Sequence, residues 1–300
     1  MNRGILYGIG AYALWGFLPI YWKQLQNVSA LEILGNRMVW SLVFCLLLLT
    51  LLQKWSWLPG ALGNRRTMLT IGSAAGLITI NWGLYIWAVN SNFIVETSLG
   101  YFINPLVSVV IGVIVLHEAL RPWQWLAIGV AALGVLYMTV TYGRPPWIAL
   151  TLAFSFAFYG LLKKKARLPA LEGLTLETAF MTPVALIYLV WLQIQGAAAF
   201  GHAGLTTDFL LISAGAITAV PLLLFAVAAQ SIPLSMVGIL QYIAPTLQFL
   251  IGVFMYHEPF DRTHLIGFSL IWLALIIYTI ENLNNRRRVR MPARSTLARS

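Results

Sequence analysis

The chain has 300 residues, of which 60% are hydrophobic and 9% are charged, and its mean hydropathy is +0.81. A soluble domain is about one quarter charged, so this chain lacks the polar side chains that would cover a water-facing surface. Residues 67–95, 178–207 and 209–257 contain no Asp, Glu, Lys or Arg. The composition excludes a soluble enzyme, a nucleic-acid-binding domain and a disordered chain. It predicts an all-α polytopic membrane protein.

Ten transmembrane helices fit the order of apolar stretches and helix-breaking residues. A helix that crosses the hydrocarbon core needs about 20 apolar residues. The stretch 209–257 must hold two helices, because a single one would be about 70 Å long at 1.5 Å per residue. The break is placed at Pro233, which suits the start of a helix. The predicted spans are residues 4–22, 32–53, 67–89, 95–116, 122–141, 145–162, 175–195, 208–228, 233–256 and 264–281.

The basic residues predict which ends of the helices face the cytoplasm. The net charge is +10, and fifteen of the 19 Lys and Arg residues fall on the side of the N-terminus, against three on the opposite side. Lys and Arg concentrate in cytoplasmic connections, so both termini are expected in the cytoplasm. The basic tail, residues 283–300, is interpreted as part of this signal. A site for anionic lipid headgroups is the alternative for such clusters.

An internal repeat relates the two halves of the chain. Residues 101–118 read YFINPLVSVVIGVIVLHE and residues 241–258 read QYIAPTLQFLIGVFMYHE, and seven of the 18 positions are identical. The matches include Pro105 with Pro245 and the terminal His-Glu pair. Because each half would hold five helices, the second half would be inverted in the membrane. Inverted repeats with a site between them are a recurring transporter plan.

Four segments carry a family resemblance: AYALWGFLPIYWK (11–23), LEILGNRMVWS (31–41), NWGLYIWAVN (81–90) and VETSLGYFINPLVSVVIGVIVLHEALRPWQW (95–125). With them the chain resembles the EamA family of the drug/metabolite transporter (DMT) superfamily, and within it the RarD group. The resemblance implies a carrier of ten transmembrane helices in a bacterial inner membrane, built as two inverted five-helix repeats. The first repeat would cover residues 1–141 and the second residues 145–282.

Arg37 is the most informative charged residue. It lies about six residues inside the second predicted span, roughly 9 Å below its outer edge. A charge at this depth normally faces a partner or a cavity. Two interpretations stay open. Arg37 forms an ion pair with Glu96 that fixes two helices, or it faces the lumen and binds a substrate carboxylate through two hydrogen bonds.

Glu32 is a poor partner for Arg37, because five residues of helix place the two side chains about 140° apart. With Ser29 it forms a capping-box pattern at a helix start, and Glu177 is expected to open the seventh span in the same way. Glu96 and, less so, Glu32 are the acids expected within reach of the lumen. They are therefore the candidates for ion coupling.

Other residues inside the spans are expected to line the transport cavity. Pro105 and Pro245 each remove a helical hydrogen bond and predict kinks there. Aromatic walls would suit a flat organic solute. The remaining polar and aromatic candidates are Trp15, Asn81, Trp82, Tyr85, Tyr101, Asn104, Tyr159, Gln241 and Tyr242.

The sequence predicts a transporter and not an enzyme. His117, His202, His257 and His264 lie in or beside connections without the spacing of a helical metal site, and no phosphate-binding loop is present. No metal and no cofactor are expected. The predicted function is a secondary transporter that exports small organic metabolites or drugs by alternating access.

Three alternatives remain: an uncoupled amino-acid facilitator or exchanger, a lipid scramblase, and a membrane enzyme. The repeat favours transport, and no helix shows the continuous polar stripe expected of a scramblase. The expected partners are a small organic solute and membrane lipid, with no nucleic acid. A monomer and a homodimer are both compatible with the small residues on the helices.

Overall fold

The computed structural model describes residues 3–116, 120–166, 168–232 and 240–290. These residues form helices and connecting turns, and no strand occurs among them. The helices are α1 (Arg3–Lys23), α2 (Ala30–Leu51), α3 (Leu58–Leu62), α4 (Arg65–Asn90), α5 (Ile94–Leu116), α6 (Pro122–Tyr142), α7 (Trp147–Ala166), α8 (Ala170–Ile194), α9 (Leu205–Ser231), α11 (Ile243–Leu250), the π-helical turn η1 (Ile251–Met255) and α12 (Arg262–Arg290).

Polar residues and glycine set where several helices begin and end. The Ser29 hydroxyl accepts a hydrogen bond from the Glu32 backbone N–H at 3.2 Å and so caps α2. The Asn64 side chain caps α4 through the Thr67 N–H at 3.0 Å. α6 is followed by Gly143, whose φ of 68° glycine adopts without steric cost. These caps satisfy backbone groups that have no partner inside the helix.

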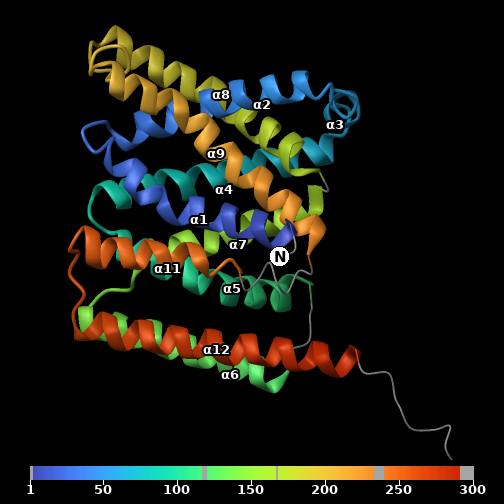
Figure 1. Ribbon diagram of the computed structural model, residues 1–300, viewed down its shortest axis with the longest axis vertical. Coiled ribbons are helices and arrows are strands. Elements are labelled where there is room, and N and C mark those ends of the chain that lie inside the picture. Colours follow the sequence, from blue (N-terminus) through green and yellow to red (C-terminus); the bar gives the residue numbers. More distant parts are fainter. Residues whose placement is uncertain (1–2, 117–119, 167, 233–239, 291–300) are drawn as a thin grey trace, which may run out of the picture.

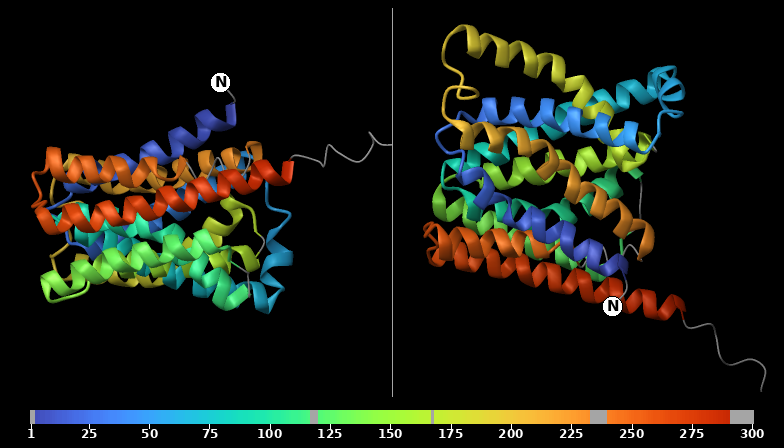
Figure 2. Two further views of the ribbon diagram at one scale, coloured as in Figure 1. Left: turned by 90° about the horizontal axis from the view of Figure 1, so that it is seen from below. Right: turned by 45° about the horizontal axis from the view of Figure 1, so that its top comes forward.

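The helices run side by side across the molecule (Figure 1). α9, α1, α11 and α12 lie in front of α4, α7, α5 and α6, and α2 and α8 form the upper edge (Figures 1 and 2). α1 begins and α12 finishes on the right of Figure 1, which we call the tail end; the left is the far end.

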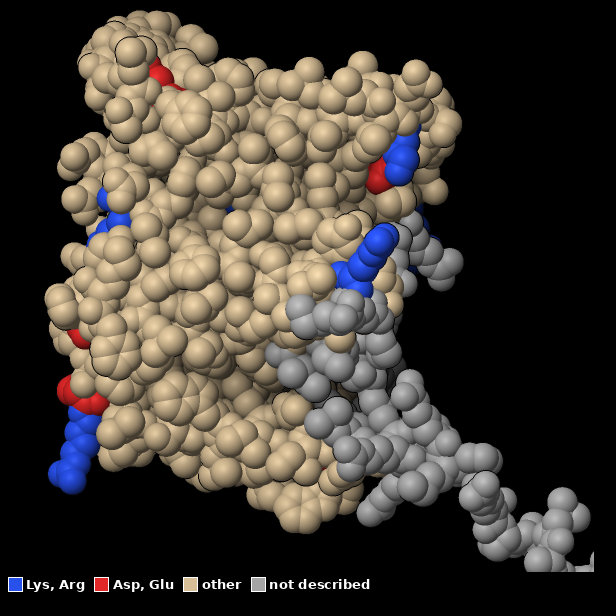
Figure 3. Space-filling view, viewed as in Figure 1, with Lys and Arg blue, Asp and Glu red and all other residues tan. Residues whose placement is uncertain are grey.

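The surface matches a membrane environment. Eight helices are long and apolar enough to cross a bilayer: α1, α2, α4, α5, α6, α8, α9 and α12. Two shorter apolar stretches cover Trp147–Lys163 and Ile243–Met255. On the face shown in Figure 3 the charged side chains gather at the tail and far ends, and the broad middle is almost free of them. The chain is a multi-pass membrane protein.

The predicted spans agree with these helices to within a few residues, except at α8, α11 and the end of α12, which runs on to Arg290. α8 begins five residues before the predicted position 175, so Glu177 lies in its second turn and does not open the helix. The expected kink at Pro245 is wrong, because Pro245 is the third residue of α11. A proline in the first turn removes no helical hydrogen bond. Pro105 does lie inside α5, and Pro233 falls outside the described residues.

Most helix packing joins residues 3–142 to residues 147–290. α1 packs on α9, α4 and α5 on α7, α2 on α8 and α9, α5 on α11, and α6 on α12. Glycines let backbones approach at several of these crossings, among them α5–α7 and α6–α12. Gly100 of α5 faces the backbone of Ala149 in α7, and Gly134 of α6 faces the Gly267 carbonyl in α12.

The α5–α7 crossing is sensitive to one added methyl group. In Gly100→Ala the new Cβ would lie 2.8 Å from the Ala149 carbonyl oxygen and 3.1 Å from its Cα. We expect a loss of about 1–3 kcal/mol in stability from this overlap, measured by thermal unfolding in detergent. Gly129→Ala is the control, since no described atom lies within 4 Å of its added Cβ. Equal stability of the two variants would contradict the crossing geometry.

Asp261 joins the far ends of α6 and α12. Its Oδ1 accepts hydrogen bonds from the Tyr142 hydroxyl at 2.6 Å and from the His264 backbone N–H at 2.9 Å. The Tyr142 hydrogen bond, followed by that from His264, lowers the pKa of Asp261 below its usual value of 3.8. The ionised carboxylate is therefore the form that holds the two helix ends together.

Acid should weaken this contact. Because the native pKa of Asp261 lies below the unfolded value, the unfolded chain binds the proton more tightly, and stability is lost as the pH falls through the lowered pKa. Asp261 is largely exposed, so we expect less than about 1 kcal/mol. The unfolding temperature of Asp261→Asn should fall less between pH 7 and pH 3 than that of the unmodified protein. Identical pH profiles would exclude the contribution.

Candidate functional site

Arg37 lies in the second turn of α2 and its exposed fraction is 4%. All residues from Glu32 to Met38 are buried, so no face of these two turns meets lipid or water. At 1.5 Å per residue, Arg37 is about 10 Å along the axis from the first residue of α2. The guanidinium is therefore enclosed by protein rather than exposed at the end of the helix.

Aromatic side chains from α1, α4 and α5 surround the guanidinium. Its Cζ lies 3.8 Å from the ring centre of Trp82 and 5.2 Å from that of Trp22. Tyr85 and Tyr101 stand edge to face with ring centres 5.8 Å apart, and both lie within electrostatic range of Arg37. A desolvated cation–π contact contributes about 2 kcal/mol. The aromatic cage comprises Tyr21, Trp22, Trp82, Tyr85 and Tyr101.

The cage leaves buried polar atoms without partners. Nε and Nη1 of Arg37, the Tyr85 hydroxyl and the Trp22 indole N–H form no hydrogen bond with any described residue. Each such group costs about 1–3 kcal/mol, and more when it is charged. These groups donate hydrogen bonds, and an acceptor with negative charge would satisfy them. The site is therefore suited to an oxyanion.

The ion pair between Arg37 and Glu96 is not formed. The Glu96 carboxylate interacts instead with the backbone of Ile148 and Ala149 in the first turn of α7, within electrostatic range of Arg144. Among the acidic side chains that the structure describes, none forms an ion pair with Arg37. Negative charge at a helix N-terminus is favourable, which explains why Glu96 faces α7.

Carboxylates also join the two halves at the far end. Glu258 accepts hydrogen bonds from the backbone N–H groups of Ile94 and Val95, both at 2.8 Å. Glu32 accepts from Ala199 at 2.7 Å and from Phe200 at 3.0 Å. Each carboxylate thus crosses from one half to the other and binds backbone N–H groups there.

Two residues at the end of α1 add further contacts at the far end. Lys23 donates to the Asn92 side chain at 2.5 Å and lies over the ring of Tyr256, 5.2 Å from its centre. The Tyr21 hydroxyl donates to the Leu210 carbonyl oxygen and lies 3.0 Å from the Ser213 hydroxyl in α9. Burial raises the pKa of Glu258 above its usual range, and Lys23 opposes that shift. The far end is closed by contacts between the halves.

Two predicted lining residues form hydrogen bonds with the backbone of α7. Asn104 donates to the Ala153 carbonyl oxygen at 3.1 Å, and Asn81 donates to the Leu152 carbonyl oxygen at 2.9 Å. Their side-chain amides therefore tie α5 and α4 to α7. The side-chain Nδ2 groups of Asn81 and Asn104 are both engaged there, although the Asn81 Oδ1 has no partner among the described residues.

The other predicted aromatic residues make their ring or hydrogen-bond contacts outside the cage. Trp15 packs on Phe225 of α9, with ring centres 5.8 Å apart. Tyr159 donates to Glu177 at 3.0 Å, beside the ion pair of Glu177 with Lys163 at 2.7 Å. Gln241 and Tyr242 lie in the turn before α11, where Tyr242 borders a groove between α5, α11 and α12. Of the predicted set, the cage brings together Arg37, Trp82, Tyr85 and Tyr101.

Sequence reasoning missed Tyr21, Trp22 and Glu258. Tyr21 and Trp22 stand at the end of a span, where aromatic residues ordinarily belong to the membrane interface. Glu258 belongs to the repeated His-Glu pair, but a role at the end of a helix was the simpler interpretation of that pair. Glu118, which is aligned with Glu258 in the repeated sequence segment, lies outside the described residues.

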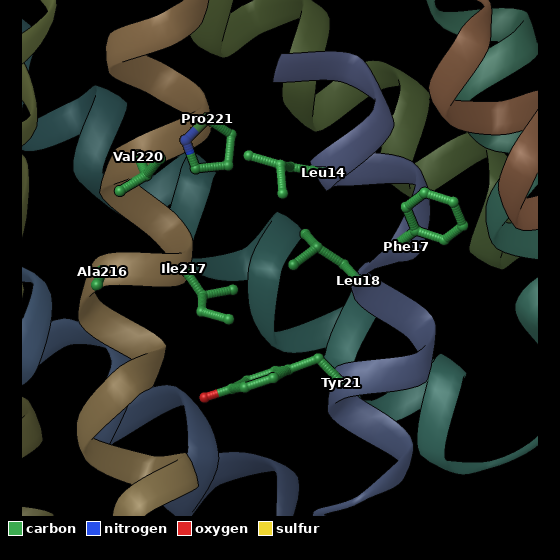
Figure 4. Close-up of a pocket in the computed structure, with 8 residues that line it drawn as sticks. All are labelled: Leu14, Phe17, Leu18, Tyr21, Ala216, Ile217, Val220 and Pro221. Carbon is green, nitrogen blue, oxygen red and sulfur yellow. The ribbon is translucent and has the colours of Figure 1, made fainter. Parts of the chain in front are cut away.

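An apolar groove separates α1 from α9 beside the cage (Figure 4). It has a volume of about 340 Å³, and Tyr21 stands at one end. Leu14, Phe17 and Val220 are partly exposed along it, so the groove opens on the outside of the helix bundle. Tyr21 therefore borders both the groove and the surroundings of Arg37.

Comparison with known proteins identifies the family. The model of the EamA-like transporter family matches residues 2–140 and again residues 145–280. The chain belongs to this family. This EamA family member is 50% identical to "Protein RarD" of Streptomyces exfoliatus, covering 96% of the chain and 92% of the relative. It is 46% identical to "Uncharacterized transporter YojE" of Bacillus subtilis, covering 95% and 96%.

More distant comparisons agree. The chain is 30% identical to "Chloramphenicol-sensitive protein RarD" of Pseudomonas aeruginosa, covering 92% of the chain and 93% of the relative. A solved structure titled "Crystal structure of protein" shares the fold with a TM-score of 0.59 and 16% identity, covering 93% of the chain and 98% of that protein. The chain is thus a RarD-like EamA transporter.

The Glu258 contact should stabilise the closed far end. In Glu258→Gln one acceptor oxygen becomes an N–H₂ donor that faces a backbone N–H, and we expect a loss of about 1–3 kcal/mol in thermal unfolding. Asp208→Asn is the matched control, since Asp208 accepts from the Gly201 backbone N–H at 2.7 Å within a single connection. A larger loss in Asp208→Asn than in Glu258→Gln would contradict the importance of the contact between halves.

Proposed function

We propose that this RarD-like protein is a secondary transporter that exports small organic metabolites or drugs by alternating access. Ten transmembrane helices would form two inverted five-helix repeats, residues 1–141 and 145–282, with a basic tail at 283–300. The two shorter apolar segments, Trp147–Lys163 and Ile243–Met255, would complete the ten. They would cross a bilayer with help from local thinning or flanking polar residues.

The packing of the helices supports the inverted repeat. If α1 corresponds to α7 and α4 to α9, the α1–α9 contact corresponds to the α7–α4 contact, and both are extensive. The α2–α8, α5–α11 and α6–α12 contacts each join a helix to its own counterpart. The two matches of one family model, residues 2–140 and 145–280, follow the same division.

The closed far end supports alternating access. With both termini in the cytoplasm of a bacterial inner-membrane protein, the far end faces outward. Glu32, Glu258 and Tyr21 then close the outer side through contacts that cross between the halves. For export these contacts must open and re-form in every cycle. Their partners are backbone N–H and hydroxyl groups, which water can replace when the outer side opens.

The observation that carries the proposal is the buried guanidinium of Arg37. A structural arginine is normally neutralised by a carboxylate, whereas here two of its nitrogens face no acceptor among the described residues. We assign Arg37 to the solute, with Trp82, Tyr85 and Tyr101 as the walls. Glu96 and Glu32 remain the candidates for ion coupling.

Solute counterflow in proteoliposomes tests the function. The panel contains aromatic and aliphatic amino acids, nucleosides, chloramphenicol and the organic anion 3-phenylpropionate, without an ion gradient. We expect transient uptake of one labelled class, driven by its unlabelled form inside, and loss of that uptake in Arg37→Gln. The matched control is Arg262→Gln, because Arg262 is an exposed arginine at the far end. Folded protein that shows no counterflow but scrambles lipid would overturn the proposal.

A further inference from the structure

We infer that the solute held by Arg37 is an organic anion with one net negative charge, and that the site discriminates against zwitterionic amino acids and organic cations. The inference rests on the proposed transport function and names the class of solute. It follows from an account of the charges in and around the aromatic cage.

The first step concerns the carboxylates. The acids that approach the far end are already engaged with backbone groups: Glu32 with Ala199 and Phe200, and Glu258 with Ile94 and Val95.

Three further acids also have partners other than Arg37. Glu96 faces the start of α7, Glu177 pairs with Lys163, and Asp261 accepts from Tyr142. None of the acidic side chains in the described part of the chain is paired with Arg37. The cage therefore carries one positive charge and no described negative charge.

The second step concerns what a solute would meet there. A carboxylate or another oxyanion accepts hydrogen bonds from the Arg37 guanidinium, whose Nε and Nη1 are unpaired among the described residues, as is the Tyr85 hydroxyl within electrostatic range of Arg37. Charge-assisted hydrogen bonds of this kind are about twice as strong as neutral ones. The anion both neutralises the guanidinium and satisfies its donors.

The third step excludes the zwitterion. The ammonium group of an amino acid lies one carbon from its carboxylate, so binding to Arg37 would bring two positive charges close together in a low-dielectric site. Indole faces bind ammonium groups, but those of Trp22 and Trp82 are already in contact with the guanidinium. A cationic solute is excluded for the same reason and more strongly.

Three probes with one aromatic frame test the inference. At pH 7 3-phenylpropionate carries one negative charge, phenylalanine is a zwitterion and 2-phenylethylamine is a cation. Each is added to the purified protein, and binding is measured from the shift in thermal unfolding and from tryptophan fluorescence, because Trp22 and Trp82 line the site. We expect 3-phenylpropionate to bind at least about tenfold more tightly than phenylalanine.

Variants assign the binding to the cage. Arg37→Gln should abolish the preference for the anion, and Arg37→Lys should weaken it because lysine lacks the planar fork of donors. If neither variant folds, Tyr85→Phe removes one hydroxyl donor and should weaken 3-phenylpropionate binding severalfold. Arg262→Gln should bind like the unmodified protein. An anion preference that survives Arg37→Gln would overturn the assignment.

The outcomes separate this inference from the proposed transport. The inference is overturned if phenylalanine binds as tightly as 3-phenylpropionate. It is also overturned if the anion does not bind at about 10 mM, which is about ten times the upper end of ordinary KM values. If phenylalanine also shows counterflow, transport stands and the solute class is wrong. If 3-phenylpropionate binds but neither it nor any panel class shows counterflow, the solute class stands and transport fails.

Discussion

Lipid offers no hydrogen-bond partner, so every polar group away from the membrane surface must find its partner inside the protein. The far end of this molecule meets that requirement with carboxylates. Glu258 binds the backbone N–H groups at the start of α5, Glu96 faces the start of α7, and Glu32 binds the connection before α9. Each acid satisfies backbone N–H groups elsewhere in the chain, so the same contacts that meet the constraint also hold the far end closed.

Arg37 departs from that rule, and the proposed solute site rests on this departure. Its guanidinium rests on indole rings, which stabilise a cation without accepting its hydrogen bonds in full. The Tyr85 hydroxyl beside it is unpaired within the described residues as well. In the proposed function this group is kept for a solute that arrives and departs, so that binding and release alter the charge balance of the cage.

Local pattern predicted the helices well, because apolar stretches bounded by charge and proline define spans. It also predicted that Arg37 is inside and that Trp82 is among the aromatic candidates. It failed where the contact of a side chain depends on a residue far away in the sequence. Spacing on one helix cannot reveal that Glu258 reaches α5, or that Glu96 faces α7 in preference to Arg37. Pro245 was expected in the middle of a span, but a turn at residues 241–242 precedes it, so that it lies in the first turn of α11.

The pairing of α6 with α12 has a consequence for how the protein is made. α6 is complete at Tyr142, whereas its main partner begins at Arg262. At about 5–20 residues per second, the ribosome needs roughly ten seconds to reach that partner. During this interval α6 must remain in lipid, or beside the insertion machinery, without the surface on which it will pack. The packing of α6 is therefore completed only when α12 enters the bilayer.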